Sequence, residues 1–172
     1  KRALAITVQD QDSVYIHSDT LMITGKPENR VIRGFYDTRL FKSNMSGKCD
    51  SVHVHQKTGL TQMIGKPVLW SGQSQLTGDT IHLLNNPKTE KLDTLKVFDN
   101  AFMIQKDSIE GYNQIKGKEL YGFFNPDNEL EKVDVLKNTE TIYWLRNDQS
   151  ELIGVNNTLA SSISIFLEEQ DI

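Results

Sequence analysis

A short phrase recurs along the chain and constrains its fold more than any other feature: an acidic residue, a hydroxyl residue and then an aliphatic residue. Clear copies, followed by two weaker ones, stand at Asp12-Ser13-Val14, Asp50-Ser51-Val52, Asp79-Thr80-Ile81, Lys118-Glu119-Leu120 and Asn157-Thr158-Leu159. Successive copies begin 38, 29, 39 and 39 residues apart. Periods of about 20 to 50 residues are typical of repeat architectures, in which equivalent segments stack and bury one continuous core.

Within the repeats, apolar and polar residues alternate, as in Val14-Tyr15-Ile16-His17, Val52-His53-Val54-His55 and Ile163-Ser164-Ile165-Phe166. A period of two is typical of β-strands with one buried face. Turn signals such as Asn85-Asn86-Pro87-Lys88 separate these runs. The sequence therefore predicts an all-β chain in which each repeat forms several short strands.

Side chains two residues apart on a strand share a face, so the aligned repeats predict which ones point inward. The aliphatic positions form one column, which we expect inside a rolled or folded sheet: Val14, Ile16, Val52, Val54, Ile81, Leu83, Leu120, Leu159, Ile163 and Ile165. The residues between them, such as His53 and His82, are expected to face outward. The stack has two open ends, near residues 12–19 and 161–167, which need a cover or serve as joints.

The composition argues against two classes of protein, the nucleic-acid binders and the proteins with a membrane-spanning helix. The 172 residues carry a net charge of −4 and include one cysteine. This acidic balance argues against a nucleic-acid partner, which would need a basic face. No apolar run approaches the roughly 20 residues of a membrane-spanning helix, and no linker divides the chain. We therefore expect a single domain over residues 1–172, either whole or a fragment of a longer protein.

Three longer phrases resemble the repeats of a known family. They are Leu69-Trp70-Ser71-Gly72 leading into Leu76-Thr77-Gly78-Asp79, Gly78-Asp79-Thr80-Ile81, and Val97-Phe98-Asp99-Asn100-Ala101-Phe102-Met103-Ile104. Their order and spacing are similar to those of the OstA/LptA family, the organic-solvent-tolerance or lipopolysaccharide-transport periplasmic proteins. More narrowly, the sequence resembles the OstA-like proteins of Bacteroidetes-type bacteria, from about Val14 to Leu167.

The resemblance implies a rolled, V-shaped β-jellyroll of stacked antiparallel strands. Its apolar groove would bind the lipid A acyl chains of lipopolysaccharide and carry them from the inner to the outer membrane, with the inward column as the lipid-binding residues. The protein would be non-catalytic, without a cofactor, and periplasmic, or the periplasmic part of an outer-membrane protein. Its partners would be lipopolysaccharide and, through edge strands, other lipopolysaccharide-transport proteins or further copies of itself. Lys66, Arg39 and Lys96 are candidates for holding headgroup phosphates.

Other interpretations of the same residues stay open. Cys49, His53 and His55 could ligate zinc, but a His-x-His strand is more often an exposed face, and we expect no metal. The periodic Asp residues indicate strand starts or turns rather than catalytic carboxylates, and no phosphate loop or nucleophile motif is present. The alternative functions are a structural or interaction β-repeat module with a closed core, and a hydrolase or carbohydrate-processing domain on a β-jellyroll.

Overall fold

The computed structural model describes residues 3–9, 12–107, 109–126 and 129–167, and these are almost entirely β-strand. The strands are β1 (Ala3–Gln9), β2 (Asp12–Ser18), β3 (Thr20–Thr24), β4 (Val31–Lys42), β5 (Met45–His55), β6 (Leu60–Ile64), β7 (Val68–Ser71), β8 (Ser74–Thr77), β9 (Thr80–Asn85), β10 (Leu92–Lys106), β11 (Tyr112–Phe124), β12 (Leu130–Arg146) and β13 (Leu152–Phe166), with a 3-10 turn, η1 (Pro27–Asn29), before β4. No helix in these ranges is long and apolar enough to cross a membrane. The predicted all-β class is confirmed.

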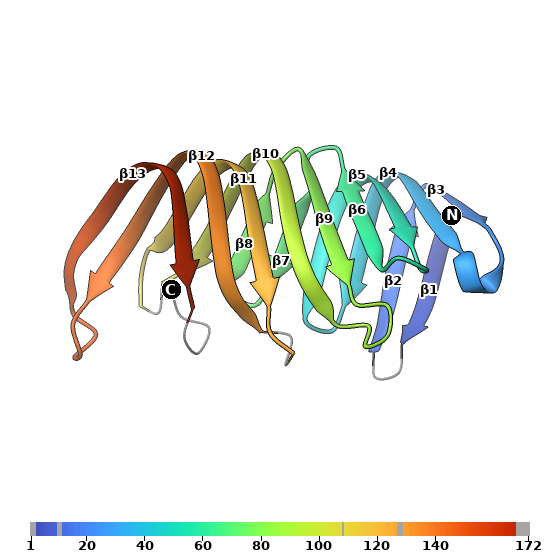
Figure 1. Cartoon of the computed structure of the whole chain (residues 1–172), viewed down its shortest axis with the longest axis horizontal. Coiled ribbons are helices and arrows are strands. Elements are labelled where there is room, and N and C mark those ends of the chain that lie inside the picture. Colours follow the sequence, from blue (N-terminus) through green and yellow to red (C-terminus); the bar gives the residue numbers. More distant parts are fainter. Residues whose placement is uncertain (1–2, 10–11, 108, 127–128, 168–172) are drawn as a thin grey trace.

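The strands lie side by side along the long axis, from β1 and β3 at one end to β13 at the other (Figure 1). All described pairs are antiparallel, and the long strands contribute one half to each of two layers. Layer A runs in the order β3, β4, β5, β6, β9, β10, β11, β12 and β13. Layer B runs in the order β1, β2, β4, β5, β7, β8, β10, β11, β12 and β13. The result is the predicted rolled jellyroll.

Each long strand passes from one layer to the other at a corner, and three of them turn there through left-handed backbone. The consecutive residues with positive φ are Tyr36 and Asp37 on β4, Asp99 and Asn100 on β10, and Lys137 and Asn138 on β12. The pairing with the next strand slips at these points, as a β-bulge requires. Asp and Asn tolerate this conformation best, which explains why they recur at the corner.

On the strands next to these bends, the acidic residue of the repeat lies at the corner and bonds to the bent strand. The backbone N–H of Asp79 donates to the carbonyls of Phe98 and Asp99 at 3.3 and 3.0 Å. Its carboxylate accepts a hydrogen bond from Asn100 Nδ2 at 3.0 Å. Asp50 occupies the equivalent position on β5, where its N–H donates to Gly65 O at 3.2 Å. The recurring acidic residues therefore hold strand crossings, Asp79 through its backbone and carboxylate and Asp50 through its backbone N–H.

The structure places the first copy of the repeat at Asp19 rather than at Asp12. Asp12 opens β2, whereas Asp19 sits at the corner, with its N–H donating to Tyr36 O at 3.1 Å. Asp19-Thr20-Leu21 fits the same pattern. The two phrases could not be told apart by residue type, because both precede an alternating run.

On β5, β11 and β13, the inward side chains shift between odd-numbered and even-numbered positions where the strand crosses the corner. On β5, Cys49 and Val52 are both buried although they are three residues apart. On β11, Gly117 and Leu120 show the same spacing. A strand without a bend would place such residues on opposite faces. Alternation therefore predicts the inward face within one layer and fails across the corner.

The space between the layers holds one continuous apolar core. Its centre is fully enclosed, and the apolar side chains with no exposed surface are Ile16, Val52, Met63, Ile81, Val97, Ala101 and Val135. They come from β2, β5, β6, β9, β10 and β12, so the core joins nearly every strand. The described strands therefore share one core.

The two ends of the jellyroll are open strand edges. At the C-terminal end, β13 pairs only with β12 among the described strands, in agreement with the predicted edge at residues 161–167. At the N-terminal end the prediction of residues 12–19 is wrong, because β1 pairs along the whole of β2 and covers it. The outermost strands there are β1 in layer B and β3 in layer A. On β1, Val8 is 80% exposed.

Backbones approach closely at the corner, and glycine is required there. A Cβ on Gly117 of β11 would lie 2.5 Å from Cγ1 of Val135, which is itself fully buried. Gly78, before the corner residue Asp79, would meet Val97 in the same way. Neither neighbour is a flexible surface side chain that could move aside, so the corner admits no Cβ at these positions.

We predict that Gly117→Ala lowers the free energy of unfolding by about 1–3 kcal/mol, because the new methyl group overpacks the corner. The matched control is Gly154→Ala on β13, where no atom lies within 4 Å of the added Cβ. That substitution should change stability by less than about 0.5 kcal/mol. Urea unfolding of the two variants measures the difference, and equal stabilities would contradict the crowding.

Candidate functional site

A groove opens between the two layers in the C-terminal half of the molecule. Its volume is about 880 Å³. The apolar side chains that line it are Leu69, Leu76, Leu95, Met103, Leu120, Phe124, Leu130, Val133 and Leu167. Gly122, on β11, faces the same space, and Leu130 packs against it: a Cβ added at Gly122 would lie 3.1 Å from Cδ1 of Leu130. A smaller cavity of about 240 Å³ continues toward the C-terminal end.

The two walls of the groove differ in chemistry. Layer A presents apolar residues from the corner to its rim, ending in Phe124 and Leu130. Layer B presents an apolar row, Leu69, Leu76, Met103 and Ile115, which neighbouring strands place side by side. Two residues further from the corner, the inward positions become polar. We call this second row the polar ladder: Ser71, Ser74, Gln105, Asn113, Tyr143 and Asn156.

The predicted lipid-binding column divides between the groove and the closed core. Leu120 lines the groove, and Ile163 and Ile165 line the smaller cavity. The other inward members are packed in or against the core: Val14, Ile16, Val52, Val54, Ile81 and Leu83. Their inward direction agrees with the strand pattern, and their contact with lipid stays a prediction.

Leu159 is the member of the column that the fold places on the outer face. Its side chain is 75% exposed, and it pairs with Glu140 on the outside of layer B. The parity change on β13 explains the difference, because Ala160 faces inward before the corner and Ile163 faces inward after it. The last copy of the repeat begins at Asn157 in the sequence, whereas the strand crosses the corner at Ser161, four residues later. Leu159 therefore lies before the corner.

Most of the groove lining was missed from the sequence. Leu69 belongs to the phrase Pro67-Val68-Leu69-Trp70, and Met103 to the phrase that ends Ala101-Phe102-Met103-Ile104. Both residues lie in the stretches that resemble the OstA/LptA repeats, but the predicted inward column does not include them. The available signal was the alternation within each phrase, which places Leu69 on the same side as the buried Pro67 and Met103 on the same side as the buried Ala101.

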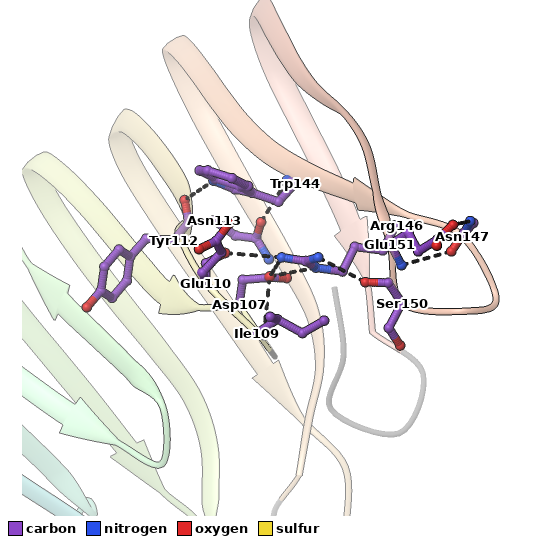
Figure 2. A network of polar contacts seen from close by, with 10 residues as sticks. All are labelled: Asp107, Ile109, Glu110, Tyr112, Asn113, Trp144, Arg146, Asn147, Ser150 and Glu151. Carbon is purple, nitrogen blue, oxygen red and sulfur yellow. Dashed lines mark hydrogen bonds and ion pairs between the residues drawn. The ribbon is translucent and has the colours of Figure 1, made fainter.

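A polar network closes the rim of layer B beside the groove (Figure 2). Arg146, the last residue of β12, donates from Nε to Asp107 Oδ2 at 2.7 Å. It also donates to the carbonyls of Ser150 and Glu110 at 3.0 and 3.2 Å. The pair is well buried, with side-chain exposures of 13% for Arg146 and 9% for Asp107. Because Asp107 also lines the groove, the network holds the β10–β11 and β12–β13 connections at a defined rim.

The predicted phosphate ligands do not line the groove. Arg39 pairs with Asp37 at 3.5 Å on the surface, and the ammonium of Lys96 lies 5.8 Å from the ring of Tyr121 on the outer face of layer A. Lys66 lies exposed, in left-handed backbone, before β7. The lysine that does reach the groove is Lys106.

The residues considered for zinc lie on opposite faces. Cys49 is buried, and burial raises the pKa of its thiol to about 12, so the thiolate form that binds metal is suppressed. His53 lies past the corner and points outward, next to Phe35. Among the described residues, no group of three His, Cys, Asp or Glu side chains could hold a metal ion.

Comparison with solved structures defines the class of fold. One match is LptH of Pseudomonas aeruginosa, the LptA-homologous periplasmic component of its conserved lipopolysaccharide transport device. The TM-score is 0.55 at 17% identity, over 70% of this chain and 73% of that chain. The protein is thus an LptA-like β-jellyroll.

The family follows from the sequence comparison. Residues 7–90 match the family described as LptA/(LptD N-terminal domain) LPS transport protein. The resemblance to the OstA/LptA family is therefore confirmed over residues 7–90. The family is one of transport proteins, in agreement with the expectation of a non-catalytic chain. No curated protein matches the sequence.

The outer face of layer A carries a histidine with a displaced pKa. Burial, and then the charge of Lys96, lower the pKa of His82 below its ordinary value. Gln62 Nε2 lies 3.0 Å from the Nε2 of this ring. The unfolded chain therefore binds a proton at His82 more readily than the folded one.

We predict that acidification costs stability partly through His82. Below about pH 6.5, the unfolded state takes up protons that the folded state resists, so the free energy of unfolding falls as the pH is lowered. His82→Gln should lose less stability than the native protein between about pH 7 and about pH 5. Urea unfolding across this range measures the two slopes, and identical slopes would contradict the assignment.

Proposed function

We propose that this chain is a periplasmic, non-catalytic transport protein that carries lipopolysaccharide from the inner to the outer membrane, with the lipid A acyl chains in the groove. The observation that carries the proposal is the 880 Å³ groove, each wall of which carries apolar side chains. The family match and the LptA-like fold supply the lipid class.

The groove is suited to transport because apolar burial is strong but imposes no strict geometry. Each square ångström of buried apolar surface contributes about 25 cal/mol, whichever aliphatic atoms make the contact. Acyl chains can therefore slide past Leu76, Met103 and Leu120 without breaking a directional bond. Lys106 at the rim is the described cation best placed for a headgroup phosphate.

The second candidate is a structural or interaction module with a closed core. The complete burial of Ile16, Val52 and Ile81 favours it, because that part of the interior leaves no space for a ligand. Under the transport proposal, lipid occupies the C-terminal half of the jellyroll and the N-terminal half is its packed support. The inward column would then bind lipid mainly through Leu120, Ile163 and Ile165.

The open edges support partners at both ends. Strand addition to a free edge uses the backbone donors and acceptors that a terminal strand leaves unpaired. β1 exposes Leu4, Ile6 and Val8, and β13 exposes Ile153 and Val155. We propose that β1 of one copy, or of another lipopolysaccharide-transport protein, pairs with β13 of the next, so that the layers continue across the joint.

A photo-crosslinking pair on one strand tests lipid carriage. Benzoylphenylalanine is placed at Met103, which lines the groove, and at its neighbour Phe102, which faces outward in the register of β10. Purified lipopolysaccharide should be labelled at Met103 and not at Phe102. Absence of labelling at Met103 in a folded protein would favour the closed module, and equal labelling at both would indicate surface adsorption.

Association through the edges has a complementary test. Thr7→Pro removes a backbone donor and disrupts β1, and Val155→Pro does the same on β13. Each variant should be monomeric in light scattering across a dilution series, while the native chain associates as its concentration rises. A mixture of the two variants retains one intact joint and should form dimers only. A native chain that is monomeric at every concentration would exclude the joint.

A further inference from the structure

The polar ladder places hydrogen-bonding groups inside the jellyroll at a defined depth. Adjacent inward residues on a strand are about 7 Å apart, so the ladder lies about that far from the apolar row of Leu69, Leu76 and Met103. The groove thus changes from apolar to polar along the direction from the corner to the rim. An amphiphile in it would place its chain against the apolar row and its head near the ladder.

Other members of the ladder already have protein partners, and Asn156 is one of them, since its Oδ1 accepts a hydrogen bond from Thr158 Oγ1 at 2.7 Å. Ser71 donates its hydroxyl to the carbonyl of Asn44 at 3.3 Å. Asn113 Oδ1 accepts the backbone N–H of Trp144 at 3.0 Å, as Figure 2 shows. These contacts tie the ladder to neighbouring strands and loops, and they leave those side-chain atoms committed to the fold.

Gln105 differs from them. It lies at the centre of the ladder, between Ser74 on β8 and Asn113 on β11, and it lines the groove. Its Oε1 is buried, and among the described residues it is the buried side-chain oxygen or nitrogen without a hydrogen-bond partner. Buried polar atoms in native proteins are nearly always paired, so the orphaned acceptor of a residue that lines the groove points to a donor that arrives with a ligand.

We infer that Gln105 is a specificity-determining residue, which selects amphiphiles that carry a hydrogen-bond donor where the acyl chain joins the head. The donor is an amide N–H or a hydroxyl, and it binds Oε1 of Gln105 while the chain lies on the apolar row. The inference rests on the proposed function, since it requires that the groove holds acyl chains. A chain joined through an ester lacks the donor and leaves the buried oxygen unpaired, which weakens its binding.

Two matched probes test the donor: the N-methyl amide and the methyl ester of decanoic acid, which differ at one N–H. Their dissociation constants are measured by displacement of anilinonaphthalene sulfonate from the folded protein. In Gln105→Met, the preference for the amide over the ester should fall roughly tenfold. Gln105→Glu keeps an acceptor and should retain the preference. Gln62→Met, on the outer face of layer A, is the control for a glutamine outside the groove and should also retain it.

Stability supplies a readout that is independent of any ligand. Because Oε1 has no protein partner, Gln105→Met should leave the unfolding temperature unchanged or raise it. A marked fall would show that the oxygen is already satisfied within the fold, and it would overturn the inference.

The remaining outcomes separate this inference from the proposed function. An amide preference that persists in Gln105→Met, or that is absent from the native protein, overturns the role of Gln105 alone. Failure of both probes to displace the dye overturns it too. Labelling of lipopolysaccharide at Met103 then decides whether the transport proposal stands without it.

Discussion

The structure depends on how strands cross the corner between its two layers. Backbones approach there too closely for a Cβ at Gly117, and strands on either side turn through paired left-handed residues such as Asp99 and Asn100. Left-handed backbone is unfavourable for non-glycine residues, so it must be supported by surrounding contacts. Asp79 supplies such support, with its N–H on the carbonyls of Phe98 and Asp99 and its carboxylate on Asn100. The recurring acidic phrase is therefore a device for folding the sheet onto itself.

Folding the sheet in this way creates an interior whose contents vary along the axis. Large side chains such as Ile16 and Met63 fill the N-terminal part completely. Further along, the layers leave the groove, which Leu95, Met103 and Leu130 line. The same two layers thus provide a packed support at one end and a binding space at the other. The network around Arg146 holds the rim of that space, since its ion pair is shielded from water.

Much of the fold could be predicted from local pattern. Alternation in Val52-His53-Val54 placed the two valines inward, and the structure agrees. The pattern failed where it was carried across the corner. Leu159 was aligned with inward residues and lies outside, and Cys49 was placed with His53 although the two lie on opposite faces. In both cases the strand bends between the layers. Residues that are an even number of positions apart then no longer lie on the same face.

The sequence by itself determined the strands, their alternation within each layer and the family resemblance, because these depend on neighbours along the chain. Only the tertiary structure decided which strands face each other and how much space remains between them. A cavity depends on the difference between the volume that two layers enclose and the volume of the side chains inside it, and residues far apart in sequence set both. The unpaired oxygen of Gln105 was hidden for the same reason, since its surroundings come from β8 and β11 rather than from its own strand.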